Sequence, residues 1–300
     1  MIDLHPRVEN ALRSGGPVVA LESTIVAHGL PRPANLDVAR QIEAAVESGG
    51  ATPATIAVVN GRIKVGLGDE DLRHVATSKD IAKASVRDLG PVIAAKASAA
   101  TTVASTAYLS HQVGIRVFAT GGLGGVHHAA SETFDESADI DVLGQVPVVV
   151  VCAGVKSILD IGATLERFET RGVPVLGYRT DTFPAFYLRD SGYALSWRVE
   201  TPAEVASVAA VRAGLGQSEA VVVAQSVSED DQMDRSLHEG LLEAAMSAAR
   251  ASGVRGKDVT PAVLAHFHQH SGGESQRVNV ALVLQNARLA AEIAAVMAPV

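Results

Sequence analysis

The sequence is poor in cysteine, aromatic residues and lysine, and each shortage narrows what the protein can be. Its 300 residues include one cysteine, Cys152, so no disulfide can form within the chain, and we expect a reducing cytoplasm as its location. Aromatic residues make up 4% of the chain, so helices are expected to pack closely through the abundant alanines. Only six of the 25 cations are lysines, so a lysine beside an apolar run stands out.

Long apolar runs and basic stretches are also absent. The longest apolar run, Val146–Val155, is far shorter than the roughly 20 residues that span a bilayer, and it is expected to be a core strand. No signal-type segment opens the chain, and no membrane association is expected. The formal charge of −8 excludes bulk nucleic acid as a partner, because phosphate neutralisation supplies most of that affinity.

Hydrophobic residues make up 47% of the chain, enough to bury a large core and to exclude disorder. Short apolar runs alternate with amphipathic stretches, which is typical of an α/β fold with helices on both faces of a sheet. No repeat or linker interrupts this pattern. We therefore expect a single domain over residues 1–300.

The expected elements follow from these patterns. The expected strands are Val18–Leu21, Thr55–Val59, Arg62–Val65, Ile115–Ala119, Val148–Cys152, Val175–Leu176 and Ala220–Ala224. Asn60-Gly61 is expected to close a hairpin between the second and third of them. The expected helices are residues 1–15, Asn35–Ser48, Thr101–Gln112, Ser157–Arg171, Pro202–Ala213, Asp234–Ser252, Thr260–His270 and Ser275–Met297. The last is apolar on almost every face, so it should be buried against the sheet or a neighbouring subunit.

Two charged side chains follow directly on apolar strands, at the strand ends where α/β proteins bind ligands. Burial of Glu22 would raise its pKa and make it a usable general acid, although a carboxylate capping the next turn is the alternative. Desolvation of Lys156 would favour a neutral, nucleophilic amine, whereas the alternative is a lysine extending into solvent from a helix N-terminus. A cation is unfavourable at that helix end, which favours a functional lysine.

A glycine-rich turn and an acidic cluster lie between those two positions. The turn GGLGG follows Thr120 and would let the backbone approach an anion. It is not a Walker loop, since no Gly-Lys-Ser/Thr follows, and it does not match the dinucleotide fingerprint, since His127 stands where a third glycine would be. His127 and His128 are equally compatible with a surface position. The acidic cluster is either solvated or a site for a hard cation such as Mg²⁺ or Mn²⁺. Its members are Glu132, Asp135, Glu136, Asp139 and Asp141.

Two other features are weaker candidates. The tract HFHQH at 266–270 places only His266 and His270 on one helix face, without a cysteine or carboxylate to complete a zinc site. Cys152 lies within a strand run and is expected to be an inert core thiol.

Eight segments together resemble the pseudouridine-5′-phosphate glycosidase family, also called indigoidine synthase A-like. They are VVALESTIVAHGLP, PATIAVVNGRIKVGL, AKASVRDL, ATTVAST, VFATGGLGGVHH, TFDESADI, VVVCAGVKSILD and GYRTDTFPAFY. The resemblance covers the chain from about Arg7 to the last helix. It implies a three-layer α/β/α sandwich that assembles as a homotrimer.

The resemblance also implies a reaction: reversible cleavage of pseudouridine 5′-phosphate into uracil and ribose 5-phosphate. The bond between the sugar and uracil is a carbon–carbon bond, so no leaving oxygen can be protonated as in an ordinary glycosidase. Opening the ribose and forming an imine at C1′ supplies an electron sink. The family's Schiff-base lysine falls on Lys156, its proton-donating glutamate on Glu22, and its manganese-binding aspartate on Asp135, with one Mn²⁺ per subunit.

The remaining family positions surround the substrate. They fall on Lys83, Val103, Thr120, His127, Ser137, Ala138, Asp139 and Asn279. Asp139 is a further candidate for proton transfer or a water-mediated metal contact. Expected phosphate donors are Lys83, Asn279 and the hydroxyls of Thr101 and Thr102, while the segment HHAAS brings no cation near the anion.

Two other functions are compatible with these residues. A sugar or nucleoside kinase would use the glycine-rich turn for ATP, although the Walker lysine is missing. A non-catalytic phosphosugar-binding or pigment-pathway accessory protein would bind ribose 5-phosphate without releasing uracil.

Overall fold

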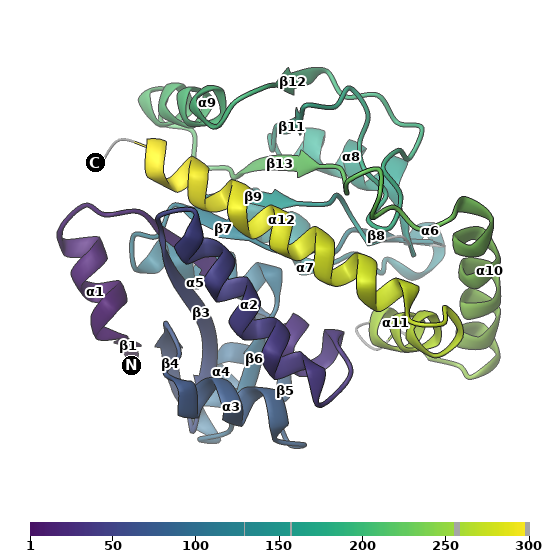
Figure 1. Ribbon diagram of the computed structural model, residues 1–300, viewed down its shortest axis with the longest axis horizontal. Coiled ribbons are helices and arrows are strands. Elements are labelled where there is room, and N and C mark those ends of the chain that lie inside the picture. The colour runs from purple at the N-terminus through teal and green to yellow at the C-terminus, as the bar shows by residue number, and fades with distance from the viewer. Residues whose placement is uncertain (129, 157, 255–258, 298–300) are drawn as a thin grey trace.

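The computed structural model describes residues 1–128, 130–156, 158–254 and 259–297 (Figure 1). Eleven of the described strands form one sheet: β1 Ile2–Leu4, β2 Val18–Leu21, β3 Thr52–Val59, β4 Arg62–Val65, β5 Ala82–Ala84, β6 Ala99–Thr101, β7 Val117–Ala119, β9 Val149–Cys152, β11 Val175–Tyr178, β12 Trp197–Val199 and β13 Val221–Gln225. The strand order is β1-β4-β3-β2-β7-β9-β13-β11-β12, with β6 on β3 and β5 on β6. Two further strands, β8 Val126–His127 and β10 Leu159–Asp160, pair with each other.

The middle of the sheet, from β3 through β2, β7, β9, β13 and β11 to β12, is parallel. Strands β2 and β9 are buried along their whole length, as expected for continuous apolar runs covered on both faces. The expected hairpin is confirmed: β3 and β4 are antiparallel, and Asn60 and Gly61 both have positive φ, as a two-residue hairpin turn requires.

Helices cover both faces of the sheet. They are α1 Pro6–Arg13, the π-helix η1 Ile25–Gly29, α2 Ala34–Ser48, α3 Asp69–Thr77, α4 Val86–Ala94, α5 Val103–Gln112, α6 Ala130–Thr133, α7 Ala138–Leu143, α8 Ile161–Thr170, α9 Pro202–Gly214, α10 Arg235–Ala251, α11 Val259–His270 and α12 Glu274–Val296. In Figure 1, α12 crosses the near face with α2 beside it, while α5, α7 and α8 lie behind the sheet. The α/β class with three layers is confirmed. The expected burial of the last helix against the sheet is also confirmed, because α12 packs on β2, β7 and β9.

Three expected helices begin elsewhere. Residues 1–15 are not one helix, because Ile2–Leu4 pairs with β4 and Pro6 starts α1 after it. Thr101 belongs to β6, so α5 begins only at Val103, after the N-cap Thr102. The helix expected from Ser157, which lies outside the described residues, begins at Ile161, because Leu159–Asp160 pairs with β8.

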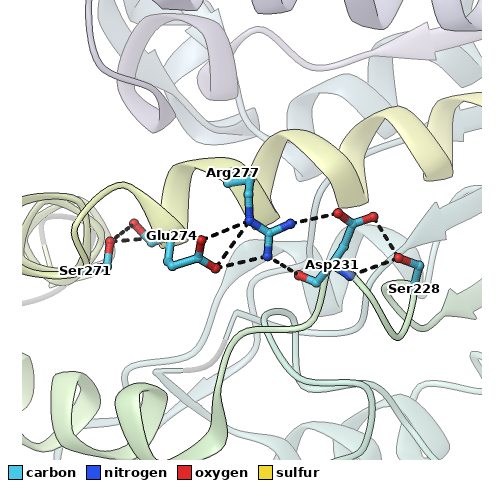
Figure 2. A network of polar contacts seen from close by, with 6 residues as sticks. Ser228, Asp231, Ser271, Glu274 and Arg277 are labelled. Carbon is cyan, nitrogen blue, oxygen red and sulfur yellow. Dashed lines mark hydrogen bonds and ion pairs between the residues drawn. The ribbon is translucent and has the colours of Figure 1, made fainter.

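The pair α10 and α11 leaves the sheet after β13 and returns through α12. Figure 2 shows an ion-pair network at the base of this pair, where Arg277 contacts Glu274 at 3.0 Å and Asp231 at 2.8 Å. Asp231 in turn accepts a 2.7 Å hydrogen bond from the Ser228 hydroxyl. The network ties the loop before α10 to the first turn of α12.

The strands of the large sheet come from positions between Ile2 and Gln225. The single domain expected for residues 1–300 stays a prediction. Within the described residues, no helix combines the length and apolar character needed to cross a bilayer. Cys152 is fully buried in β9, and burial raises its pKa to about 12, so the expected inert core thiol is confirmed.

Candidate active site

The carboxyl ends of β2, β7 and β9 lie side by side and bring the predicted residues to one edge of the sheet. A cavity of about 340 Å³ opens there. Nine of the eleven predicted site residues line it: Glu22, Lys83, Val103, His127, Asp135, Ser137, Ala138, Asp139 and Lys156. Asn279 lines an adjoining apolar pocket of about 50 Å³, which shares Glu22, Lys83 and Lys156 with the cavity. Thr120, the eleventh, contacts Glu22 directly.

Glu22 is a buried carboxyl group with only 8% of its surface exposed. Burial raises its pKa, while the charge of Lys156 and a hydrogen bond from the Thr120 hydroxyl act in the opposite direction. Because its described hydrogen bond comes from Thr120, the capping alternative does not describe its environment. The net direction favours the protonated form of this carboxyl group, which is the form that a general acid requires.

Lys156 lies in the turn between β9 and β10. Its backbone N–H donates to the Leu123 carbonyl at 3.1 Å, and its carbonyl accepts from Leu159 N–H at 3.0 Å. The expectation that it precedes a helix directly is wrong, since α8 begins only at Ile161, so the helix dipole gives no argument about this lysine. Its position comes instead from pairing with the glycine-rich turn.

The glycine-rich turn is used for close packing. Gly124 N–H donates to the Asp139 carboxylate at 2.7 Å, and Leu123 N–H donates to the Gly154 carbonyl at 2.9 Å. A Cβ on Gly124 would overlap the Ser137 hydroxyl. The expectation that these amides point at an anion is therefore wrong for Leu123 and Gly124, because the protein already uses them.

Asp139 joins two of the elements that line the cavity. Besides Gly124, its carboxylate accepts a 2.9 Å hydrogen bond from the backbone N–H of Ala104, in the first turn of α5. This buried carboxylate holds the glycine-rich turn against the start of α5. The charge of Asp139 also raises the pKa of Glu22.

Two other residues of the acidic cluster form ion pairs, and Asp135 lines the cavity. Glu136 pairs with Arg167 at 2.9 Å, and Asp141 pairs with Arg171. Asp135 lines the cavity beside His127, whose pKa is lowered mainly by burial, against the charge of Asp135.

The side chains near Asp135 restrict the kind of metal ion that the cavity could hold. Within the described ranges, no group of three or more histidine, cysteine, aspartate or glutamate side chains forms a cage for a metal. One carboxylate, Asp135, with the His127 imidazole beside it, suits a hard cation that keeps most of its water. The histidine tract forms no site either: His270 Nδ1 contacts the His266 carbonyl at 2.9 Å, and His268 bridges Ser275 and Gly29.

This chain matches one known protein family over nearly its whole length. The family described as "Indigoidine synthase A like protein" matches residues 7–296. The chain belongs to this family. A relative from Salinispora tropica is 55% identical over 96% of this chain and 89% of its own length, and one from Nocardioides sp. is 50% identical over 98% and 96%; both are named pseudouridine-5′-phosphate glycosidase.

Two solved structures have the same fold as this chain. The prealnumycin C-glycosynthase AlnA, in complex with ribulose 5-phosphate, superposes with a TM-score of 0.91 at 34% identity, over 99% of this chain and 97% of that one. An indigoidine synthase A-like protein from Thermotoga maritima gives 0.89 at 33% identity, over 98% and 96%.

Several residues of this indigoidine synthase A-like chain that line the cavity or its pocket were not predicted from the sequence. They are Thr24, Ser85, Arg87, Asp88 and Phe186. Ser85, Arg87 and Asp88 lie at the start of α4, a short helix that the apolar pattern did not predict. Phe186 has a positive φ of 60°, a strain that no sequence pattern reveals.

Two expected phosphate donors have different surroundings from those predicted. Thr101 is fully buried, and its hydroxyl donates to the Ile56 carbonyl at 2.6 Å, so it is not available to a ligand. Asn279 lines the apolar pocket with Phe186 and Leu264 and does not line the larger cavity.

Proposed function

We propose that this protein is a pseudouridine-5′-phosphate glycosidase, which cleaves pseudouridine 5′-phosphate with water into uracil and ribose 5-phosphate. The observation that carries the proposal is the pairing of Glu22 and Lys156. A buried carboxyl group with a raised pKa and an amine line one cavity, close enough for the charge of Lys156 to act on that pKa. Relatives at 50–55% identity carry the same activity in their names.

A carbon–carbon glycosidic bond needs this combination of acid and amine. The Lys156 nitrogen forms a bond to C1′ while the C1′–O4′ bond breaks, and the ring oxygen takes a proton released by the amine. Glu22 then protonates uracil C5. The nitrogen lone pair forms a C=N double bond as the C1′–C5 bond breaks, and uracil leaves. Glu22 regains the second proton of the amine, and water hydrolyses the Schiff base to restore Lys156 and release ribose 5-phosphate.

The two compartments suit the two ends of this substrate. The base is assigned to the apolar pocket because Phe186 and Asn279 line it together with Glu22, which has to reach uracil C5. The Asn279 side-chain oxygen is buried and has no hydrogen-bond partner among the described residues, so it is available to an N–H of the base. The ribose and its phosphate are assigned to the polar cavity, which the charged residues line.

Asp135 is proposed to hold one Mn²⁺ per subunit, with water completing its shell and His127 beside it. A bound divalent cation supplies positive charge near the anionic substrate. Homotrimeric assembly and a cytoplasmic location complete the proposal, supported by the family relationship and the lone buried cysteine. Mass photometry would test the assembly, and a monomer at micromolar concentration would contradict it.

The experiment that tests the function measures uracil release from pseudouridine 5′-phosphate with Mn²⁺ and with EDTA. Release is expected with Mn²⁺ and a loss of rate with EDTA. Lys156→Ala is expected to abolish turnover, while Lys79→Ala, at an exposed position outside the cavity, is the matched control. Absence of uracil from the wild-type protein in both conditions would defeat the proposal.

A chemical trap tests the Schiff base separately. Borohydride reduction in the presence of ribose 5-phosphate is expected to add the sugar to the peptide that carries Lys156. An unmodified peptide in an active preparation would rule out this mechanism. Binding of ribose 5-phosphate without uracil release would instead indicate the non-catalytic accessory protein, and turnover of ATP would indicate the kinase.

A further inference from the structure

The cavity has a polar end, lined by residues that do not line the apolar pocket. Glu22, Lys83 and Lys156 line both compartments, whereas Ser85, Arg87 and Thr102 line only the cavity. If the proposed function holds, uracil lies on the side of the apolar pocket, where Phe186 and the unpartnered side-chain oxygen of Asn279 suit a base and Glu22 is within the same lining. The 5′-phosphate, at the other end of the nucleotide, then lies toward these polar residues.

Arg87 is a cation at this end with one weak ion pair among the described residues. It is the second residue of α4, where the helix dipole disfavours a cation, and its side chain is 78% exposed. Among the described residues, its one ion pair is a 3.7 Å contact with the neighbouring Asp88. Asp88 already accepts a 3.0 Å hydrogen bond from Ser85 N–H, as part of the cap of α4. Packing and helix stability therefore give no reason for an arginine here.

We propose that Arg87 binds the 5′-phosphate of the substrate and so selects the nucleotide over the free nucleoside. A guanidinium group donates two parallel hydrogen bonds to a phosphate, and Lys83 approaches the same cavity from β5, four residues earlier. The segment HHAAS at 127–131 contains no lysine or arginine, and Arg87 provides a positive charge for the phosphate in its place. This inference rests on the proposed function, because it names the group that recognises one part of that substrate.

The test compares Arg87→Ala and Arg87→Lys with the wild-type enzyme on two substrates, pseudouridine 5′-phosphate and pseudouridine. Arg87→Ala is expected to raise KM for the nucleotide roughly 10- to 100-fold with kcat nearly unchanged, because phosphate binding is the same in ground and transition states. Its kcat/KM for pseudouridine should not change. Arg87→Lys should fall between the two, since it keeps the charge but not the paired hydrogen bonds.

Arg235→Ala is the matched control. Arg235 is also an exposed arginine at the start of a helix, with a weak 3.9 Å ion pair to Glu239, but it does not line the cavity or its pocket. An unchanged KM in Arg87→Ala, or an equal loss on both substrates, would overturn the inference while leaving the glycosidase intact. Calorimetry with ribose 5-phosphate separates the two claims: weaker binding to Arg87→Ala supports Arg87 even if the wild-type protein releases no uracil.

Discussion

At the scale of single residues, the state of Glu22 depends on neighbours that act in opposite directions. Burial and the charge of Asp139 raise its pKa, whereas Lys156, Thr120 and Lys83 lower it. In the proposed mechanism Glu22 is the general acid, which works only while protonated, so activity is expected to be lost as the pH rises through its pKa. The alkaline limb of the kcat profile therefore reports on each of these neighbours.

Thr120→Val is expected to move that alkaline limb to higher pH. The substitution keeps the shape of the side chain but removes the hydroxyl that donates to the ionised carboxylate, so the pKa of Glu22 rises further. Stopped-time uracil assays between pH 5 and 10 would measure the shift. A limb that moves to lower pH would show that Thr120 favours the protonated form instead.

Asp139→Asn is expected to move the same limb to lower pH, because it removes the charge that raises the pKa of Glu22. An amide oxygen can replace only part of the carboxylate, which accepts from both Ala104 N–H and Gly124 N–H. A loss of about 1–3 kcal/mol in the free energy of unfolding should accompany the shift. Opposite shifts in the two variants, measured side by side, distinguish electrostatics from general damage to the site.

At the scale of elements, the Arg277 network decides how firmly α10 and α11 are held at their base (Figure 2). Its ion pairs are about 40% exposed, so Arg277→Ala should cost less than about 1 kcal/mol of global stability. The local effect should be larger: hydrogen exchange is expected to rise in residues 228–234 and 271–277. Arg13→Ala, which removes an exposed pair on α1, is the control, and equal exchange in both variants would contradict this role.

Apolar elements buried on both faces could be predicted from the sequence, whereas several short elements without a continuous apolar run could not. Strands β2, β9 and β13 are continuous apolar runs, and α12 is apolar around its circumference, so local composition identifies them. Strand β1 has three residues and exists because it pairs with Arg62–Val65, some sixty positions away. Such an element depends on its partner and has no local signal.

The site shows the same division. Glu22 and Lys156 could be found because Glu22 directly follows strand β2 and Lys156 directly follows the apolar run Val146–Val155. The use of Gly124 N–H by Asp139 could not be predicted, because it depends on where α7 packs. Arg87 was missed because a cation in the first turn of a short helix looks like ordinary surface.

At the scale of the whole molecule, His238 is expected to make the free energy of unfolding depend on pH in the acidic range. It is 5% exposed in α10 and packs against the stacked rings of Tyr187 and Phe267, and neither of its ring nitrogens has a hydrogen-bond partner among the described residues. Burial, with the nearby charge of Arg235, lowers its pKa to about 4 from an ordinary 6.5. The folded state therefore resists protonation at a pH where the unfolded chain accepts it.

The sign of the effect follows from this difference. Between pH 6.5 and 4 the unfolded state binds the extra proton, so the free energy of unfolding should fall as the pH falls, by an amount on the order of 3 kcal/mol from this residue. His238→Phe removes the titrating group from an aromatic environment and should flatten that part of the curve, whereas His111→Gln at an exposed position should leave the slope as in the wild type. Urea unfolding at pH 7, 5.5 and 4.5 measures all three proteins. If His238→Phe kept the full wild-type slope, the acid sensitivity of the fold would have to arise from other groups.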